Sequence, residues 1–216
     1  QTKTDNFIGN TTLRYQLLNG LEAKADIGYT RMNVRQTQKI FSNNVNPFSS
    51  SSYTNESYLA STQMGTISVE PQLNYTVRMN RSLFSALLGS TYQHTTTTLD
   101  YFTGRNFPSD AFMGSFAAAA VIADKGSNRE EYKYQSVFGR LSYTWDDKYI
   151  LNGTVRRDGS SRFGEGNRFG NFWAVGAGWI FSNEAFIAQL LPVMTFGKLR
   201  ASYGTTGNDQ IGNYRY

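Results

Sequence analysis

The chain has 216 residues, of which 39% are hydrophobic and 17% charged, and its formal net charge is +5. The absence of cysteine excludes a disulfide scaffold and a thiolate metal site. Lysine and arginine are scattered along the chain, so nucleic-acid binding is not expected. The mean hydropathy of −0.46 does not exclude a membrane barrel, because half of each barrel strand faces a polar interior.

Two strands joined by a tight turn are the first predicted elements. Leu13, Tyr15 and Leu17 alternate with polar residues, and the same alternation returns over residues 21–30. Asn19-Gly20 lies between them and tolerates the positive φ angles of a short hairpin turn. The N-terminal part of the chain is therefore predicted to form a β-hairpin.

Residues 67–78 carry the strongest pattern in the chain. Every second residue is apolar: Ile67, Val69, Pro71, Leu73, Tyr75 and Val77. A strand of this length is longer than most strands of soluble proteins and matches the roughly 9 to 11 residues that a tilted strand needs to cross a bilayer. This pattern predicts a strand with one lipid-facing side and one wet side.

Polar connections separate the other predicted strands. Residues 37–63 are rich in Ser and Asn and predict a long loop, whereas 79–81 form a tight connection to a strand over 83–96. Residues 99–130 predict a second long loop, in which 115–123 form either a short helix or a buried apolar plug.

Alternation returns in the C-terminal third. It predicts strands over residues 132–145, 149–158, 173–179 and 198–203, with a tight turn at 146–148. About eight strands joined alternately by tight and long connections are typical of outer-membrane barrels, whose short turns are periplasmic and whose longer loops are extracellular. Both ends of such a path lie on the outer side. We therefore expect an all-β, antiparallel arc of a larger transmembrane barrel.

One face of these strands is expected to be wet. The charged residues assigned to it are Glu22, Lys24, Asp26, Glu70, Arg78, Arg140, Arg156, Lys198 and Arg200. The apolar residues that alternate with them are expected to contact outer-membrane lipid.

Two segments resemble a known family. Residues 146–187, DDKYILNGTVRRDGSSRFGEGNRFGNFWAVGAGWIFSNEAFI, and residues 198–214, KLRASYGTTGNDQIGNY, strongly resemble the barrel of SusC/RagA-type TonB-dependent outer-membrane transporters. The resemblance implies that residues 1–216 are part of a barrel domain of about 22 strands, multi-pass in the bacterial outer membrane. The plug domain and the remaining strands would lie outside this chain.

The resemblance also implies a function. A transporter of this type has no enzyme activity, needs no cofactor, and imports oligosaccharides or peptides too large for porins. TonB would power it through the plug region, and a SusD-like surface lipoprotein would assist it. Two alternatives stay open at this point: a small self-contained outer-membrane barrel acting as an adhesin or structural protein, and a soluble β-sandwich with carbohydrate-binding loops.

Two groups of residues are candidates for the functional site. The family motif expected at the extracellular rim comprises Arg157, Asp158, Gly159, Ser160, Ser161, Arg162, Phe163 and Gly164. It is interpreted as a bend at the rim or, alternatively, as a direct ligand contact. The aromatic residues expected to stack on a ligand from the long loops are Tyr53, Tyr58, Tyr101, Phe102 and Phe107. Alternatively, these rings hold the loops together. His94 is the single histidine, so catalytic triads and metal sites are not expected.

Overall fold

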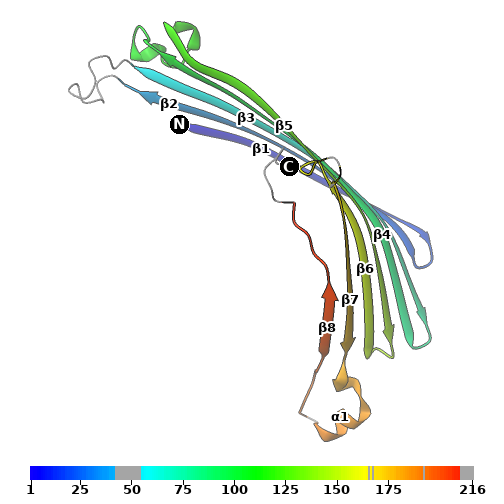
Figure 1. The fold of residues 1–216 in the computed structure, drawn as a ribbon. Helices are drawn as coiled ribbons and strands as arrows, with labels where there is room; N and C mark the ends of the chain where they lie inside the picture. The colour runs from blue at the N-terminus through cyan, green and yellow to red at the C-terminus, as the bar shows by residue number, and fades with distance from the viewer. Residues whose placement is uncertain (42–54, 165, 167, 192, 210–216) are drawn as a thin grey trace. The chain divides into compact units, whose positions relative to one another are not determined.

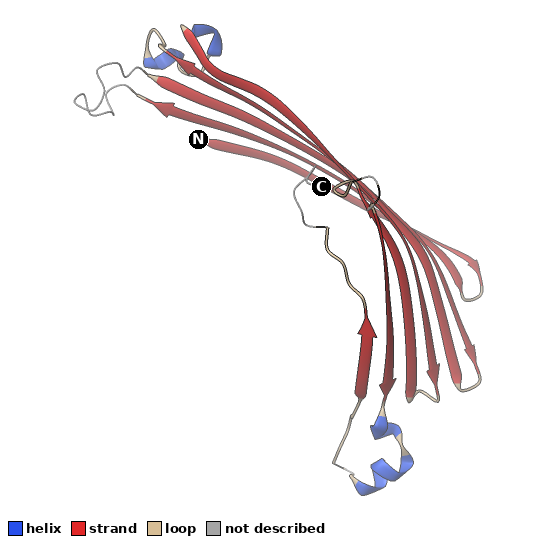
Figure 2. Ribbon diagram, in the orientation of Figure 1, coloured by secondary structure: helices blue, strands red, loops and turns tan. Residues whose placement is uncertain are grey.

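The structure is a computed structural model that describes residues 1–41, 55–164, 166, 168–191 and 193–209. Strands make up most of the described chain, and the short helices are confined to the connections (Figure 2). Within the described residues, no helix has both the length and the apolar character needed to cross a membrane.

About eight strands were expected, and the described residues contain eight; Figure 1 labels them in chain order. In chain order the elements are β1 (Thr2–Leu18), β2 (Leu21–Ile40), β3 (Glu56–Met79), β4 (Ser82–Arg105), η2 (Asp110–Phe112), η3 (Phe116–Ala118), β5 (Val121–Trp145), β6 (Tyr149–Ser160), β7 (Phe169–Trp179), η4 (Phe181–Asn183), α1 (Ala185–Leu190) and β8 (Leu199–Gly204).

Neighbours in sequence are neighbours in the sheet, with the order β1-β2-β3-β4-β5-β6-β7-β8. By backbone contacts the chain divides into two compact units. The first contains residues 1–9, 29–67 and 95–131, and the second contains residues 10–28, 68–94 and 132–216. The second unit holds the tight turns together with β6, β7 and β8.

The tight turns of the second unit are confirmed at the predicted places. Gly20 has a φ of 81°, Asn80 of 50°, and Asp146 and Asp147 of 57° and 51°. These left-handed conformations are accessible to Gly and tolerated by Asn and Asp, which explains the residue types at these turns. Each turn reverses the chain within a few residues, so consecutive strands pair directly.

The apolar face of the second unit is exposed, as predicted. Leu73 is 38% exposed, Leu151 59% and Val155 64%, although all three are apolar. In β5, β6 and β7 the outward positions are the odd-numbered ones, because Leu141 pairs with Gly153 and Gly153 pairs with Val175. Exposed apolar side chains in such regular alternation are typical of a lipid-facing barrel wall and do not fit a soluble sandwich core.

The inner face carries linked polar groups. Lys24 Nζ lies 2.6 Å from Asp26 Oδ2, and the hydroxyl of Thr12 donates to Asp26 Oδ1 at 2.6 Å. Glu70 accepts hydrogen bonds from the amide of Gln72 at 2.6 Å and from the hydroxyl of Thr91 at 3.0 Å. The carboxylates of Asp26 and Glu70 therefore have polar partners on their own strand and on a neighbouring strand.

The two long loops were predicted too long. In the first unit β2 continues to Ile40 and β3 begins at Glu56, while β4 continues to Arg105 and β5 begins at Val121. The Ser and Asn residues that suggested the first loop lie mostly between Ile40 and Glu56, whereas the strand ends on either side mix polar and apolar residues without a clear alternation. The hydroxyls of Thr66 and Thr95 lie 2.9 Å apart. The alternation was weak here because polar residues occupy both faces.

The connection between β4 and β5 is folded. Asn55 clasps Phe107, accepting a hydrogen bond from its N–H at 2.8 Å and donating one to its carbonyl at 3.1 Å. Met113 is fully buried, and Arg105 Nε lies 2.8 Å from a carboxylate oxygen of Glu56. Of the two predictions for residues 115–123, the structure shows a short 3-10 turn at Phe116–Ala118, followed by the start of β5.

Candidate functional site

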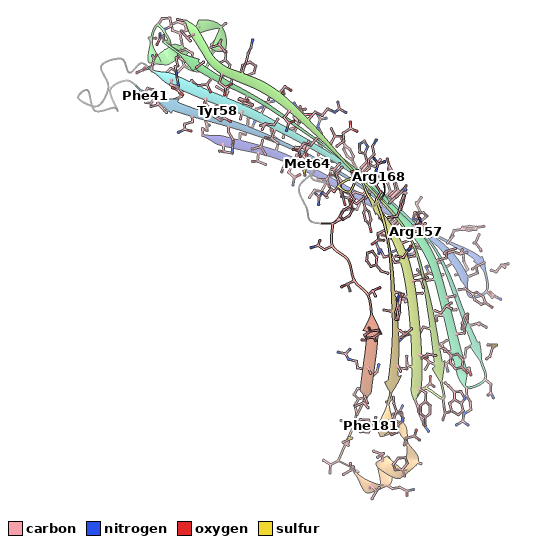
Figure 3. All side chains as sticks on the ribbon, in the orientation of Figure 1. Phe41, Tyr58, Met64, Arg157, Arg168 and Phe181 are labelled. Atoms are coloured by element: carbon pink, nitrogen blue, oxygen red, sulfur yellow. The ribbon has the colours of Figure 1, made fainter. Side chains whose placement is uncertain are left out.

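The rim motif, residues 157–164, ends β6 and starts the connection to β7. Arg157 lies with its guanidinium carbon 5.1 Å from the centroid of the Phe169 ring, and Figure 3 labels this residue. Gly159 pairs with Phe169, and a Cβ at Gly159 would come within 2.5 Å of that ring. The glycine is therefore needed for the ring to lie across the strand.

Hydrogen bonds close the motif against its neighbours. The N–H of Ser160 donates to the Arg168 carbonyl at 3.0 Å, and the N–H of Ser161 donates to the Lys133 carbonyl at 2.9 Å. Ser161 Oγ in turn accepts the N–H of Lys133 at 2.9 Å. Phe163 and Gly164 follow in the connection. These bonds hold the bend between β5 and β7.

Asp158 of the motif is paired with the residue just before the motif, Arg156. Arg156 Nε donates to Asp158 Oδ1 at 2.5 Å, and Arg156 also donates to the hydroxyls of Tyr134 and Ser136. The same guanidinium lies 5.3 Å from the ring centroid of Phe138. The carboxylate of Asp158 thus accepts its hydrogen bond from a residue of the same strand, β6.

A second segment meets the rim motif: residues 204–209, here named the crossing segment, which begin at the last residue of β8. The N–H of Thr205 donates to the Trp173 carbonyl at 2.8 Å. A Cβ at Gly204 would lie 2.5 Å from that carbonyl oxygen, and a Cβ at Gly207 would lie 2.2 Å from the Phe172 ring. Both glycines let the crossing segment lie directly on β7.

Tyr132 of β5 fastens the crossing segment. Its hydroxyl donates to Asp209 Oδ2 at 2.6 Å, and Arg162 Nη1 donates to the Asp209 carbonyl at 3.1 Å. Arg162 also covers the Tyr132 ring at 4.4 Å. The rim motif and the crossing segment, which lie more than 40 residues apart in the sequence, therefore form one structure.

Removing the hydroxyl of Tyr132 will loosen this structure. A hydrogen bond to a charged group contributes about 1.5–3 kcal/mol, so in Tyr132→Phe we expect amide hydrogen exchange in residues 205–209 to rise by at least about 10-fold. Hydrogen-exchange mass spectrometry measures this directly. Tyr134→Phe is the matched control, since its hydroxyl serves Arg156 instead. Equal exchange in both variants would contradict the prediction.

A cavity of about 460 Å³, named the inner cavity, lies where the two segments meet β5, β6 and β7. Its aromatic lining is Tyr132, Tyr134, Phe163, Phe169 and Phe172. Its charged and amide lining is Gln93, Asp158, Arg168, Asn208 and Asp209. Ring faces together with a few convergent polar groups suit binding of a polar ligand that also has apolar faces.

Of the aromatic residues predicted to lie in the long loops, Tyr58, Tyr101 and Phe102 lie instead on strands, because β3 and β4 extend further than expected. Tyr58 is half-buried on β3 and is labelled in Figure 3, whereas Tyr53 lies outside the described residues. Phe102 is 40% exposed, and its ring centroid lies 5.0 Å from that of Phe116. Neither Tyr58 nor Phe102 is fully buried.

The other two aromatic residues of this group, Tyr101 and Phe107, pack within the first unit. A Cβ at Gly126 would lie 2.6 Å from the Tyr101 ring, so this ring covers β5. Phe107 is only 6% exposed and its backbone is clasped by Asn55. For Phe107 this placement favours the alternative interpretation, in which the ring holds the loop together.

A polar network lies at the turn side of the second unit. Arg81 Nη2 lies 2.6 Å from Asp146 Oδ1, and Lys148 Nζ lies 3.2 Å from both Asp146 and Glu184. Glu184 also accepts hydrogen bonds from the Tyr149 hydroxyl at 2.6 Å and the Trp179 indole at 3.2 Å. This turn network ties the β5–β6 turn to the segment that follows β7.

The turn network makes stability depend on pH. Hydrogen bonds from Tyr149 and Trp179 lower the pKa of Glu184. Partial desolvation raises the pKa of Asp146, but the hydrogen bond from Lys148 and the charge of Arg81 outweigh it, so this pKa is also lowered. Hydrogen bonds to Asp146 and Glu184 raise the pKa of Lys148.

A carboxylate with a lowered folded-state pKa stabilises the fold fully above its ordinary value and loses this effect as pH falls through the folded-state pKa. We therefore expect Glu184→Gln to lower the denaturation midpoint at pH 7, by an amount that shrinks as pH falls below about 4.5, the ordinary value for Glu. Lys148 acts in the opposite sense, losing its effect only above its ordinary value of 10.5. Denaturant titration at several pH values measures this, and a pH-independent difference would contradict it.

Sequence reasoning did not single out Tyr132 or Glu184. Gly204 and Gly207 lie in the segment 198–214 that resembles the transporter family, but their contact with β7 was not predicted. Glycine at these two positions is the sequence signal from which a close backbone approach could have been inferred. Nothing in the sequence around Tyr132 indicates its pairing with Asp209, because the contact depends on the course of the chain after β8.

The fold and the two-sided sheet define the wall of an outer-membrane β-barrel. A family model described as "TonB dependent receptor-like, beta-barrel" matches residues 1–216. The chain is 29% identical over 220 residues to TonB-dependent receptor P3 of Formosa agariphila, covering 99% of this chain and 21% of that protein. It is 41% identical over 78 residues to TonB-dependent receptor SusC of Bacteroides thetaiotaomicron, covering 36% of this chain and 8% of SusC.

Among solved structures, the chain matches the RagAB peptide transporter with a TM-score of 0.88 and 27% identity, covering 99% of this chain and 24% of that one. The chain therefore belongs to the TonB-dependent receptor β-barrel family and is of the SusC/RagA type. Its place is the bacterial outer membrane, and proteins of this family are transporters and not enzymes. The chain spans about a fifth of the length of the curated relative that it matches throughout.

Proposed function

We propose that this chain forms part of the wall and outer rim of an importer of oligosaccharides or peptides that are too large for porins. The observation that carries the proposal is the two-sided sheet of the second unit. Leu73 and Val155 expose apolar side chains outward, whereas Asp26 and Glu70 take part in polar contacts on the inner face. A wall of this kind separates lipid from a hydrated passage.

The proposal includes two partners. The TonB system would supply energy through a plug region, and a SusD-like surface lipoprotein would cover the extracellular mouth. The similarity to SusC and to RagAB supports this assignment. Import then needs no bond-making step by this chain, because its role is to enclose and select the ligand.

Ligand contact is proposed for the exposed aromatic surface and for the inner cavity. Tyr58 on β3 and Phe102 on β4 are not fully buried, and Tyr53 is proposed from the sequence alone. In the rim motif, Asp158 already pairs with Arg156 of β6 and Arg162 covers Tyr132, so we assign the motif mainly to holding the bend. Aromatic faces stack equally on sugar rings and on peptide side chains.

A growth experiment tests the proposal. The gene for the complete receptor is deleted, and the strain is grown on defined oligosaccharides or on defined peptides as the limiting nutrient. We expect growth to fail on one of these classes, to return with the intact gene, and to stop when a protonophore removes the energy for TonB. Unchanged growth and unchanged uptake of labelled ligands of both classes would overturn the proposal.

A further inference from the structure

Strand pairing arranges the outward side chains of β5, β6 and β7 in rows. One row contains Leu141, Gly153 and Val175, in that order across the three strands. Gly153 therefore leaves a gap between two large apolar side chains. In the next row toward the β5–β6 turn, Leu151 pairs with Ala177, so the small residue of that row is on β7 and not on β6.

The gaps line up into a furrow. Gly139 of β5, Gly153 of β6 and Ala177 of β7 each lie one row closer to the turn than the one before. A hollow of about 670 Å³ includes Gly139 and Gly153, and a second of about 820 Å³ includes Ala177 and Ala201. We name this run of small residues and its two hollows the outer furrow.

The protein itself does not require glycine at position 153. A Cβ built there would meet no atom within 4 Å, so no neighbouring group occupies the space. The only glycine with a positive φ among the described residues is Gly20, so the backbone does not demand it either. Glycine in a strand interior is unfavourable. The space is therefore open to something outside the chain.

The position of the outer furrow indicates what fills it. Gly153 follows Tyr149, the first residue of β6, by four positions, or ~13 Å along the strand. The tight turns of such barrels are periplasmic. Aromatic side chains that mark a membrane interface lie at the same end, at Trp145, Tyr149 and Trp179. The furrow thus lies in the periplasmic half of the bilayer.

We propose that the outer furrow binds one acyl chain of a phospholipid from the periplasmic leaflet. Two diagonal steps from Gly139 to Ala177 cover ~16 Å at ordinary strand spacings. One leaflet provides a similar depth of hydrocarbon, since the whole core is about 30 Å thick. The walls are apolar, from Leu141, Val155 and Val175. The phospholipid head group then lies beside the interfacial aromatic rings. This site is on the lipid side and does not depend on the imported ligand.

The test places a large side chain at position 153, in the outer furrow. The complete receptor is purified in detergent as wild type and as Gly153→Leu, dipalmitoyl phosphatidylglycerol is added, and retained lipid is counted by native mass spectrometry. Wild type should keep about one more phospholipid per receptor than Gly153→Leu at the same collision energy. Gly65→Leu is the matched control, because a Cβ at Gly65 also meets nothing within 4 Å and this residue does not line either hollow.

A second variant guards against failed folding. Ala177→Leu fills the hollow nearer the turn, and heat-modifiable migration in gels confirms that each variant is folded before lipid is counted. Ala177→Leu should lose the same lipid. Equal retention by wild type and either folded variant would overturn the proposal. A wild-type dimer that Gly153→Leu dissociates would also overturn it, because the furrow would then be a contact between proteins.

Discussion

Replacing Leu73 with arginine is expected to destabilise the barrel in a bilayer by about 2–4 kcal/mol, the cost of a charged side chain on the lipid face near the midplane. Leu73 lies six residues before Met79, the last residue of β3, which places it ~20 Å along the strand from the turn. Its side chain is outward and 38% exposed. The arginine would therefore have to reach the interface or remain buried in hydrocarbon.

The measurement is denaturant-induced unfolding of the complete receptor in phospholipid vesicles. Asn74→Arg is the matched control, because Asn74 is the next residue of β3 and lies on the inner face. We expect the control to change the unfolding free energy by less than about 1 kcal/mol, as surface substitutions in a wet environment do. Equal losses for the two variants would mean that the two faces do not differ in solvent, and the assignment of the wall would fail.

Gly20→Ala is expected to destabilise the second unit by about 2–5 kcal/mol, through left-handed backbone strain and steric overlap together. Gly20 has a φ of 81°, and a Cβ there would lie 2.3 Å from the carbonyl oxygen of Thr76. The same region is closed by a bond from the Thr76 N–H to the Gly20 carbonyl at 2.7 Å. Neither the backbone of Gly20 nor that of Thr76 can shift without disturbing the pairing of β2 with β3.

Gly153→Ala is the matched control for this variant, because its added Cβ meets nothing and its φ is not positive. The control should be neutral or slightly stabilising, since alanine restricts the unfolded chain. Unfolding midpoints of the two variants, measured under the same conditions, distinguish a strained turn from a general intolerance of added methyl groups. Similar midpoints would contradict the strain argument.

The strand pattern was predictable wherever the two faces have different solvents. Alternation at Leu73 and Leu151 correctly gave both the presence of the strands and the direction of the side chains. It failed in residues 37–40, 56–63, 99–105 and 121–130, which were predicted as loops but belong to strands, because polar residues there occupy both faces. The burial of Phe107 was not predictable from local alternation either, since the backbone of this residue is held by hydrogen bonds to the distant Asn55.

By itself, the amino-acid sequence determined that this protein is a membrane-facing antiparallel wall with tight turns at fixed places. Period-two alternation and turn residues such as Gly20 are local properties, and local physics is enough to specify them. Only the tertiary structure decided that Asp209 returns to Tyr132, that Glu184 joins the turn network, and that Gly153 opens a furrow. These features depend on which residues become neighbours across strands, and that register is set by the whole sheet.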